Sequence, residues 1–177
     1  MRKLTMSELN RMDVEEYRNV EKLPIVIVLD NIRSLSNVGS FFRTADAFRI
    51  ETLFLCGITA CPPHREIHKT ALGADDSVQW RYFKTTVEAC ECLKNAGYTI
   101  FAVEQVENSV MLDDFIVPQK SAYIFGNEVD GIDDVLLPYC TQAVEIPQMG
   151  TKHSLNVSVS AGIVMYRIFA SLHHLLS

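Results

Sequence analysis

The sequence contains neither a CxxC pair nor a glycine-rich GxGxxG motif after its first apolar segment. Its cysteines number five, an odd count that is typical of free thiols in a reducing compartment rather than of a disulfide framework. The missing GxGxxG motif argues against a nicotinamide dinucleotide as the ligand of the first loop. Both absences direct attention to other classes of ligand.

Features typical of secreted or membrane proteins are also scarce. Residues 1–19 are predominantly polar, unlike a signal peptide. The most apolar run, residues 157–176, is interrupted by three serines, Arg167, His173 and His174. A membrane span needs about 20 mostly apolar residues. We therefore expect a buried helix there, and a soluble, cytoplasmic protein with no membrane partner.

Basic residues are fewer than acidic ones. Lys and Arg total 16 against 22 Asp and Glu, which gives a net charge of −6. Dedicated nucleic-acid binders usually carry a basic surface, so the overall balance argues against that partner, although a local patch suffices. Five cations fall in expected loops or helix starts that would share one rim of the fold: Arg33, Arg43, Arg65, Lys69 and Lys152.

A metal site is not expected. Cys61, His64 and His68 are spaced closely enough to suggest one. A structural zinc site uses four ligands, however, and no second cluster in the sequence supplies the remainder. A loop that leads into a short helix is the simpler interpretation of this stretch.

Expected strands and helices alternate along most of the chain. Residues 25–30 (IVIVLD) are a β-branched run typical of a strand buried on both faces. Further strands are expected at residues 51–57, 77–83, 98–105, 121–127 and 143–147. Helices are expected at residues 6–20, 37–48, within 62–73, from Thr85 or Thr86 to Gly97, near 133–137, and at 154–175.

This alternation predicts an α/β fold with a mostly parallel sheet. Residues 1–177 are expected to form a single domain, with residues 1–20 as a helical extension at its N-terminus. Asn37, a good N-cap residue, is expected to begin the helix after the first strand.

Three loops leave the carboxyl ends of expected strands, at residues 30–37, 126–131 and 147–154. Ligands of parallel α/β sheets bind beyond these ends. Gly126 and Gly131 suit a backbone that turns sharply or approaches a ligand closely, although ordinary turn glycines would look the same.

Polar residues near these loops are further candidates. Arg43 lies among apolar residues of an expected helix, and it either extends to solvent or points into a cleft. Glu128 could be a solvated surface acid, Ser154 a helix N-cap, and Asn156 an exposed residue of a first turn. Their joint placement at one edge of the sheet favours a functional site.

The sequence closely resembles the SpoU-type, TrmH-like branch of the SPOUT RNA methyltransferases. Three motifs of that family occur in order: NVGSFFR at residues 37–43, FGNEVDG at 125–131, and IPQMG at 146–150 followed by SLNVS at 154–158. The pattern covers residues 24–175. Two departures are small: Asn127 stands where Ser is common, and Val129-Asp130 precedes Gly131 where a simpler glycine-containing run is usual.

The resemblance implies transfer of a methyl group from S-adenosyl-L-methionine to a ribose 2′-hydroxyl of tRNA or rRNA, with tRNA favoured, by a homodimer. It implies a SPOUT fold, with helices on both faces of the sheet and a deep trefoil knot in a cofactor-binding region at residues 122–175, an exception to the rule that chains avoid knots. The implied catalytic residues are Arg43, Asn37, Glu128, Ser154 and Asn156, and the implied cofactor-binding residues are Val103, Gly126, Ile146, Met149 and Leu155.

Arg43 is the leading catalytic candidate. A guanidinium group is effectively always protonated, so we expect it to grip a substrate phosphate and orient the 2′-hydroxyl, and to act as a base only if a phosphate helps to remove its proton. Two other interpretations stay open. One is a non-catalytic RNA-binding relative, and the other is a nucleotide-dependent enzyme on an ordinary doubly wound sheet.

Overall fold

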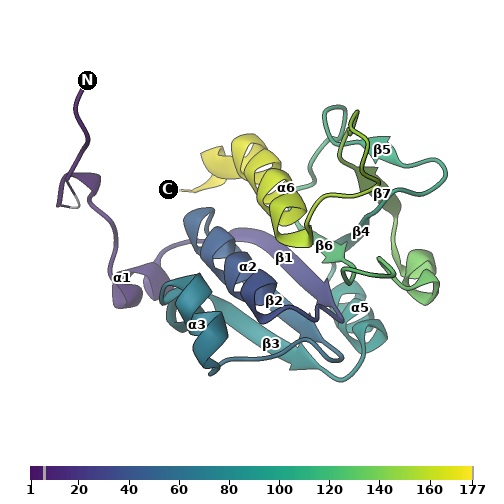
Figure 1. Ribbon diagram of the computed structural model, residues 1–177, viewed down its shortest axis with the longest axis horizontal. Coiled ribbons are helices and arrows are strands. Elements are labelled where there is room, and N and C mark those ends of the chain that lie inside the picture. The colour runs from purple at the N-terminus through teal and green to yellow at the C-terminus, as the bar shows by residue number, and fades with distance from the viewer. Residues whose placement is uncertain (6, 177) are drawn as a thin grey trace.

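A seven-stranded sheet forms the centre of the molecule (Figure 1), which we describe from a computed structural model covering residues 1–5 and 7–176. The strands are β1 (Leu23–Asp30), β2 (Ile50–Cys56), β3 (Gln79–Phe83), β4 (Thr99–Val103), β5 (Val110–Met111), β6 (Ser121–Phe125) and β7 (Gln142–Glu145). Their order is β3-β2-β1-β6-β4-β7-β5, and each neighbouring pair is parallel. The predicted α/β fold with a parallel sheet is confirmed.

Helices cover both faces of this sheet, as expected. Along β1, Ile25, Ile27 and Leu29 pack into one apolar cluster, and Val26 and Val28 pack into another. This division follows from the alternation of side chains along a strand. The first cluster is closed by residues of α1 (Val14–Asn19), α2 (Leu35–Ala47), α3 (Arg65–Ala71), α4 (Ala74–Ser77) and α6 (Val157–Leu172). The second is closed by α5 (Thr86–Asn95) and the 3₁₀ helix η2 (Asp134–Tyr139).

A buried acid at the end of β1, Asp30, connects the sheet to the elements that cover the second cluster. Its carboxylate accepts hydrogen bonds from Thr86 Oγ1 at 2.5 Å, from Asn31 Nδ2 at 2.9 Å and from Asp133 N at 3.5 Å. Because a buried carboxylate must be hydrogen-bonded, these contacts fix α5 and the start of η2 against the carboxyl edge of the sheet.

The six expected strands are present, with ends that differ from the prediction by a few residues. The sequence analysis missed the seventh, β5. This strand has two residues, too few to show the alternation that identifies a strand, and it pairs only with Val144 and Glu145 of β7.

The prediction that Asn37 begins the second helix is wrong. Helix α2 begins at Leu35, and Ser34 is its N-cap, with the Ser34 hydroxyl accepting a hydrogen bond from Asn37 N at 3.3 Å. Asn37 is buried in the first turn of the helix, and its side chain makes tertiary hydrogen bonds instead.

The helix expected over residues 6–20 is also shorter than predicted, and its start at Met6 lies outside the described residues. The segment contains a 3₁₀ turn, η1 (Ser7–Leu9), and the helix α1. Between them Asn10 adopts a positive φ of 44°, and Asp13 begins α1 through a capping box with Glu16. Tyr17 is buried against the domain, whereas Leu9 and Met12 are exposed.

The final helix begins three residues later than expected. Asn156 is the N-cap of α6, which ends at Leu172 and is followed by a 3₁₀ turn, η3 (His173–Leu175). Within the described residues, no helix combines the length and the apolar character required to cross a bilayer. Threading of residues 122–175 into a trefoil knot stays a prediction from the resemblance.

Backbone segments meet very closely where β6 ends. A Cβ atom built on Gly126 would lie 2.0 Å from the carbonyl carbon of Gly131 and 2.2 Å from the backbone nitrogen of Ile132. Real Cβ atoms do not approach backbone at such distances. The close approach therefore requires glycine at residue 126.

Replacing Gly126 by Ala should destabilise the protein by about 1–3 kcal/mol, because the added methyl group meets backbone atoms that cannot rotate away. Urea unfolding measures the effect. The matched control is Gly150→Ala, since a Cβ atom there would meet nothing within 4 Å and should leave the midpoint unchanged. A wild-type midpoint for Gly126→Ala would contradict the packing described here.

Candidate functional site

A cavity of about 670 Å³ lies at the carboxyl edge of the sheet. Its walls come from the segments that follow β4, β6 and β7 and from the first turn of α6. Because all paired strands are parallel, these carboxyl ends meet at one edge, where ligands of such sheets bind. The chain thus brings together segments that lie far apart in sequence.

The loop after β6 is a rigid turn. Asn127 and Gly131 form an antiparallel bridge, and the Asn127 side-chain oxygen accepts hydrogen bonds from the N–H groups of Val129 and Asp130 at 3.0 and 2.9 Å. Gly131 has a φ of +72°, and a Cβ atom there would lie 2.4 Å from Glu104 Oε2. These constraints hold residue 128 at the top of the turn.

Glu128 ties this turn to the start of α2. Its carboxylate accepts hydrogen bonds from Asn37 Nδ2 at 2.7 Å, from Arg33 N at 3.1 Å and from Ser34 N at 3.2 Å. Burial alone would raise the pKa of Glu128, but these hydrogen bonds outweigh it and hold the pKa below its usual value. Glu128 is therefore an anchored carboxylate, and the alternative of a freely solvated acid is wrong.

Asn37 continues this connection to α6. Its side-chain oxygen accepts a hydrogen bond from Asn156 Nδ2 at 3.3 Å. The Asn156 oxygen in turn caps α6 by accepting from Ser158 N at 2.9 Å and Val159 N at 3.4 Å. Glu128, Asn37 and Asn156 thus link three chain segments through side-chain hydrogen bonds beside the cavity.

Seven of the ten predicted site residues line the cavity: Val103, Gly126, Glu128, Ile146, Ser154, Leu155 and Asn156. Asn37 does not line it but holds two residues that do. Met149 is fully exposed to solvent and lies outside the lining. Arg43 is exposed and also outside the lining, and its guanidinium makes no hydrogen bond or ion pair with any residue that the structure describes.

Four carboxylates in the lining were not among the predicted site residues, namely Glu104, Asp130, Asp134 and Glu145. Glu104 directly follows β4 and accepts hydrogen bonds from Ile132 N at 3.2 Å and Gln105 N at 2.9 Å. Its position after a strand was the signal that could have identified it. Among the described lining residues none is Lys, Arg or His.

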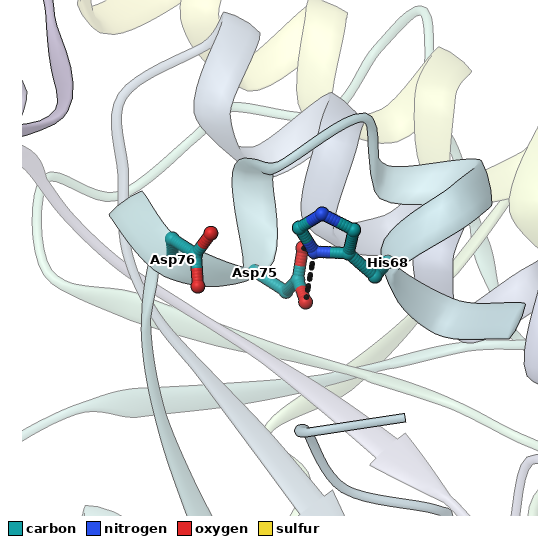
Figure 2. A group of neighbouring side chains, drawn as sticks. All are labelled: His68, Asp75 and Asp76. Atoms are coloured by element: carbon teal, nitrogen blue, oxygen red, sulfur yellow. Dashed lines mark hydrogen bonds and ion pairs between the residues drawn. The ribbon is translucent and has the colours of Figure 1, made fainter. Parts of the chain in front are cut away.

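Among the described residues, Cys61 and His64 do not join His68 in a group of potential metal ligands. His68 Nδ1 lies 3.0 Å from one Asp75 carboxylate oxygen and 3.1 Å from the other (Figure 2). With Asp76 these residues place potential ligand atoms within 4.8 Å of one another. None of the three lines the cavity, so this group is separate from the site described above.

Comparisons with known proteins agree with this architecture. The SpoU rRNA Methylase family model matches residues 24–166. The chain is similar to the 23S rRNA (guanosine-2′-O-)-methyltransferase RlmB of Neisseria meningitidis, with 29% identity over 157 residues, which is 88% of this chain and 62% of that protein. The chain therefore spans less than two thirds of this relative's length.

Two solved structures share the fold. The A. aeolicus TrmH/SpoU tRNA modifying enzyme has a TM-score of 0.81 at 22% identity, covering 91% of this chain and 81% of that chain. The AdoMet-bound rRNA methyltransferase from Sinorhizobium meliloti has a TM-score of 0.78 at 24% identity, covering 93% and 60%. The family model spans well over half of the chain, and the residues it includes build the cavity and the Glu128–Asn37 contact. The chain belongs to the SpoU rRNA Methylase family.

Proposed function

We propose that this protein is an S-adenosyl-L-methionine-dependent RNA methyltransferase that modifies a ribose 2′-hydroxyl. The observation that carries the proposal is the hydrogen-bonded series Glu128–Asn37–Asn156 beside a cavity at the carboxyl edge of the sheet. It joins one residue from each of the three family motifs. A solely structural element would not need a cavity at the point where all three converge.

The cavity suits S-adenosyl-L-methionine. Its volume of about 670 Å³ falls in the range of small-molecule sites, and Val103, Ile146 and Leu155 supply apolar walls. Gly126 also belongs to the lining and places no side chain in the cavity. The absence of cationic side chains from the described lining disfavours a phosphate-bearing dinucleotide and favours a cationic ligand.

When bound, S-adenosyl-L-methionine supplies an activated methyl group on a sulfonium. The protein must then align a weak hydroxyl nucleophile, and alignment of this kind can give effective molarities of about 10⁵ M or more. Glu128 and Asn156 border the cavity, and Asn37 holds both of them in place. We assign Asn37 as a positioning residue, and Ser154, whose side chain is exposed at the cavity, as a contact for the ribose.

Arg43 has a different role in this proposal. It lies on the same outward face of α2 as Ser36 and Ala47 and is not part of the cavity. An exposed, permanently charged guanidinium suits an RNA phosphate, which it can bind through two hydrogen bonds. We therefore assign Arg43 to gripping the substrate and orienting its 2′-hydroxyl rather than to holding the methyl donor.

The active form is proposed to be a homodimer formed through α6. This helix exposes Val159, Ile163 and Tyr166 on one side, with Tyr166 61% exposed. A contiguous apolar stripe of this kind is typical of an interface. Because α6 starts at the cavity, a second copy packed on this stripe would border the site.

The RNA target is proposed to be tRNA in preference to rRNA, in the cytoplasm. The relatives named above include enzymes of both RNA classes, so the assay must offer both. The alternative of a non-catalytic RNA-binding relative is disfavoured by the presence of all five implied catalytic residues, Asn37, Arg43, Glu128, Ser154 and Asn156.

The function is tested by incubating the purified protein with S-adenosyl-L-methionine labelled on its methyl group and with bulk tRNA or rRNA. The labelled RNA should resist alkaline cleavage at the phosphodiester bond that follows the methylated nucleotide, because a methylated 2′-oxygen cannot attack the adjacent phosphate. RNA from a strain lacking the gene serves as the unmodified substrate. Absence of label in both RNA classes would reject the proposal.

Arg43→Ala should lower the rate of methyl transfer by at least about 100-fold while changing cofactor affinity by less than about twofold, because Arg43 lies outside the cavity. Arg43→Lys should recover little, since an ammonium group lacks the planar pair of donors. Single-turnover rates and calorimetry separate the two effects. Arg81→Ala, on the edge strand β3, is the control. Wild-type methylation by Arg43→Ala would refute the assignment.

Glu128→Gln should slow methyl transfer and alter the response to acid. The amide nitrogen of Gln would face a backbone N–H donor, so the link to α2 loses a hydrogen bond. Because the pKa of Glu128 lies below its unfolded value of 4.5, its contribution to stability is present at neutral pH and is lost as the pH falls through the folded-state pKa.

The unfolding free energy of Glu128→Gln should therefore decline less steeply than that of the wild type between about pH 5 and pH 3. Chemical denaturation across this range provides the measurement. The exposed Glu107, changed to Gln, is the control and should behave as the wild type. Identical acid profiles for the wild type and Glu128→Gln would contradict the anchoring role.

Ile163→Arg should convert the proposed homodimer to a monomer, because burying a charge on the α6 stripe without an oppositely charged group beside it is unfavourable. Sedimentation velocity gives the oligomeric state. Ile58→Arg is the control, since Ile58 is 65% exposed in the segment between β2 and α3. A wild-type protein that sediments as a monomer at all concentrations would overturn the dimer.

A further inference from the structure

The cavity carries charge of one sign. Five carboxylates belong to its lining: Glu104, Glu128, Asp130, Asp134 and Glu145. Among the described lining residues none is positively charged. The exposed Lys152 and His153 lie in the neighbouring loop but are not part of the lining. The cavity therefore presents a negative potential to any ligand that enters it.

Two of these carboxylates are largely compensated. Glu128 accepts the hydrogen bonds from Asn37 and from the loop before α2. Asp130 lies 3.6 Å from the Arg33 guanidinium in an exposed ion pair. Their contribution to the potential inside the cavity is correspondingly reduced.

The remaining three acids face the cavity without a cationic partner. Glu104 accepts only backbone hydrogen bonds, and Glu145 accepts one from the Ser109 hydroxyl at 2.6 Å. The Asp134 carboxylate makes no hydrogen bond or ion pair with any residue in the described part of the chain. These three come from different segments, after β4, in η2 and at the end of β7, so they surround the space rather than crowd one wall.

We propose that these carboxylates make the cavity selective for the cationic methyl donor over its neutral product, and that the loss of this attraction promotes product release. The inference rests on the proposed function. In the transfer, the bond between sulfur and the methyl carbon breaks and the 2′-oxygen forms a bond to that carbon. The electron pair of the broken bond stays on sulfur, and the hydroxyl proton passes to solvent.

The ligand's charge falls by one in this step. S-adenosyl-L-methionine has a sulfonium, an ammonium and a carboxylate, for a net charge of +1, whereas S-adenosylhomocysteine has lost the sulfonium charge and is neutral. All other hydrogen-bonding groups are the same in both molecules. The two ligands also differ in the methyl group, so the change in their affinity ratio on removal of a carboxylate, rather than the ratio itself, reports the electrostatic field of the cavity.

Replacing one carboxylate by its amide distinguishes an effect of charge on ligand affinity from an effect of hydrogen bonding. If Glu104, Asp134 or Glu145 only accepted hydrogen bonds from the ligand, replacing it by the amide would weaken both ligands equally. If the charge itself matters, the replacement weakens the donor alone. Salt should likewise weaken only the donor, because mobile ions screen the field in an open, solvated cavity.

The test is calorimetry of S-adenosyl-L-methionine and S-adenosylhomocysteine with the wild-type protein and with the variants Asp134→Asn and Glu104→Gln. We expect the wild type to bind the donor about tenfold more tightly than the product at low ionic strength, and Asp134→Asn to reduce this ratio severalfold. Salt at about 0.5 M should bring the ratio close to one. Asp134→Asn disturbs no recorded hydrogen bond, so it keeps the test valid if Glu104→Gln unfolds.

Glu107→Gln, an exposed acid outside the lining, is the matched control and should preserve the wild-type ratio. Equal or tighter binding of the product by the wild type would overturn the charge selectivity and leave the proposed function standing. The same holds if Asp134→Asn and Glu104→Gln, both folded, keep the wild-type ratio. Failure of both ligands to bind would overturn the proposed function, and the present inference with it.

Discussion

The Glu128 carboxylate and the Asn37 amide form the contact on which the rest of the site depends. Glu128 lies on the turn after β6, whereas Asn37 lies in the first turn of α2, and the two residues are 91 positions apart in the sequence. Their hydrogen bond of 2.7 Å fixes the carboxyl ends of the neighbouring strands β1 and β6 relative to each other. A carboxylate that accepts several N–H groups is a stronger anchor than a neutral acceptor, since charge-assisted hydrogen bonds are shorter and stronger.

This contact works because the surrounding backbone leaves little freedom. The turn that carries Glu128 is closed by the Asn127–Gly131 bridge, and Gly126 permits an approach of backbone segments that no other residue allows. On the other side of β1, Asp30 connects the sheet edge to α5 and η2. The site is therefore supported from both faces of the sheet, which suits a reaction that depends on alignment.

Much of this arrangement could be predicted from the sequence. Strands β1 and β6, at the centre of the sheet, are mostly apolar runs, and the rule that ligands bind beyond the carboxyl ends of parallel strands predicted the edge at which Gly126, Glu128 and Ser154 line the cavity. The start of α2 was not predictable in the same way. Ser34 and Asn37 are both good N-caps, and tertiary contacts with Glu128 and Asn156 decide between them.

Whether a side chain lines the cavity was harder to predict than whether its residue belongs to a motif. A motif identifies Arg43 and Met149 as neighbours of the site in sequence, but the turn of α2 and the course of the loop after β7 place both outside the cavity. Asp134 belongs to no motif and does not follow a strand, so only the folded chain reveals that it lines the same space as Glu128. The charge of the cavity is the sum of contributions from segments that lie far apart in the sequence.

The strand order has a consequence for biosynthesis. Strand β6 lies between β1 and β4, yet it is made after both of them. While the ribosome is still extending the chain, the edge of β1 that pairs with β6 keeps unpaired backbone groups until residue 125 has emerged. Such open edges are templates for unwanted association, and sheets built from distant segments assemble slowly. The central insertion of β6 therefore exposes the nascent chain to unwanted association until β6 itself has emerged, after the first five strands.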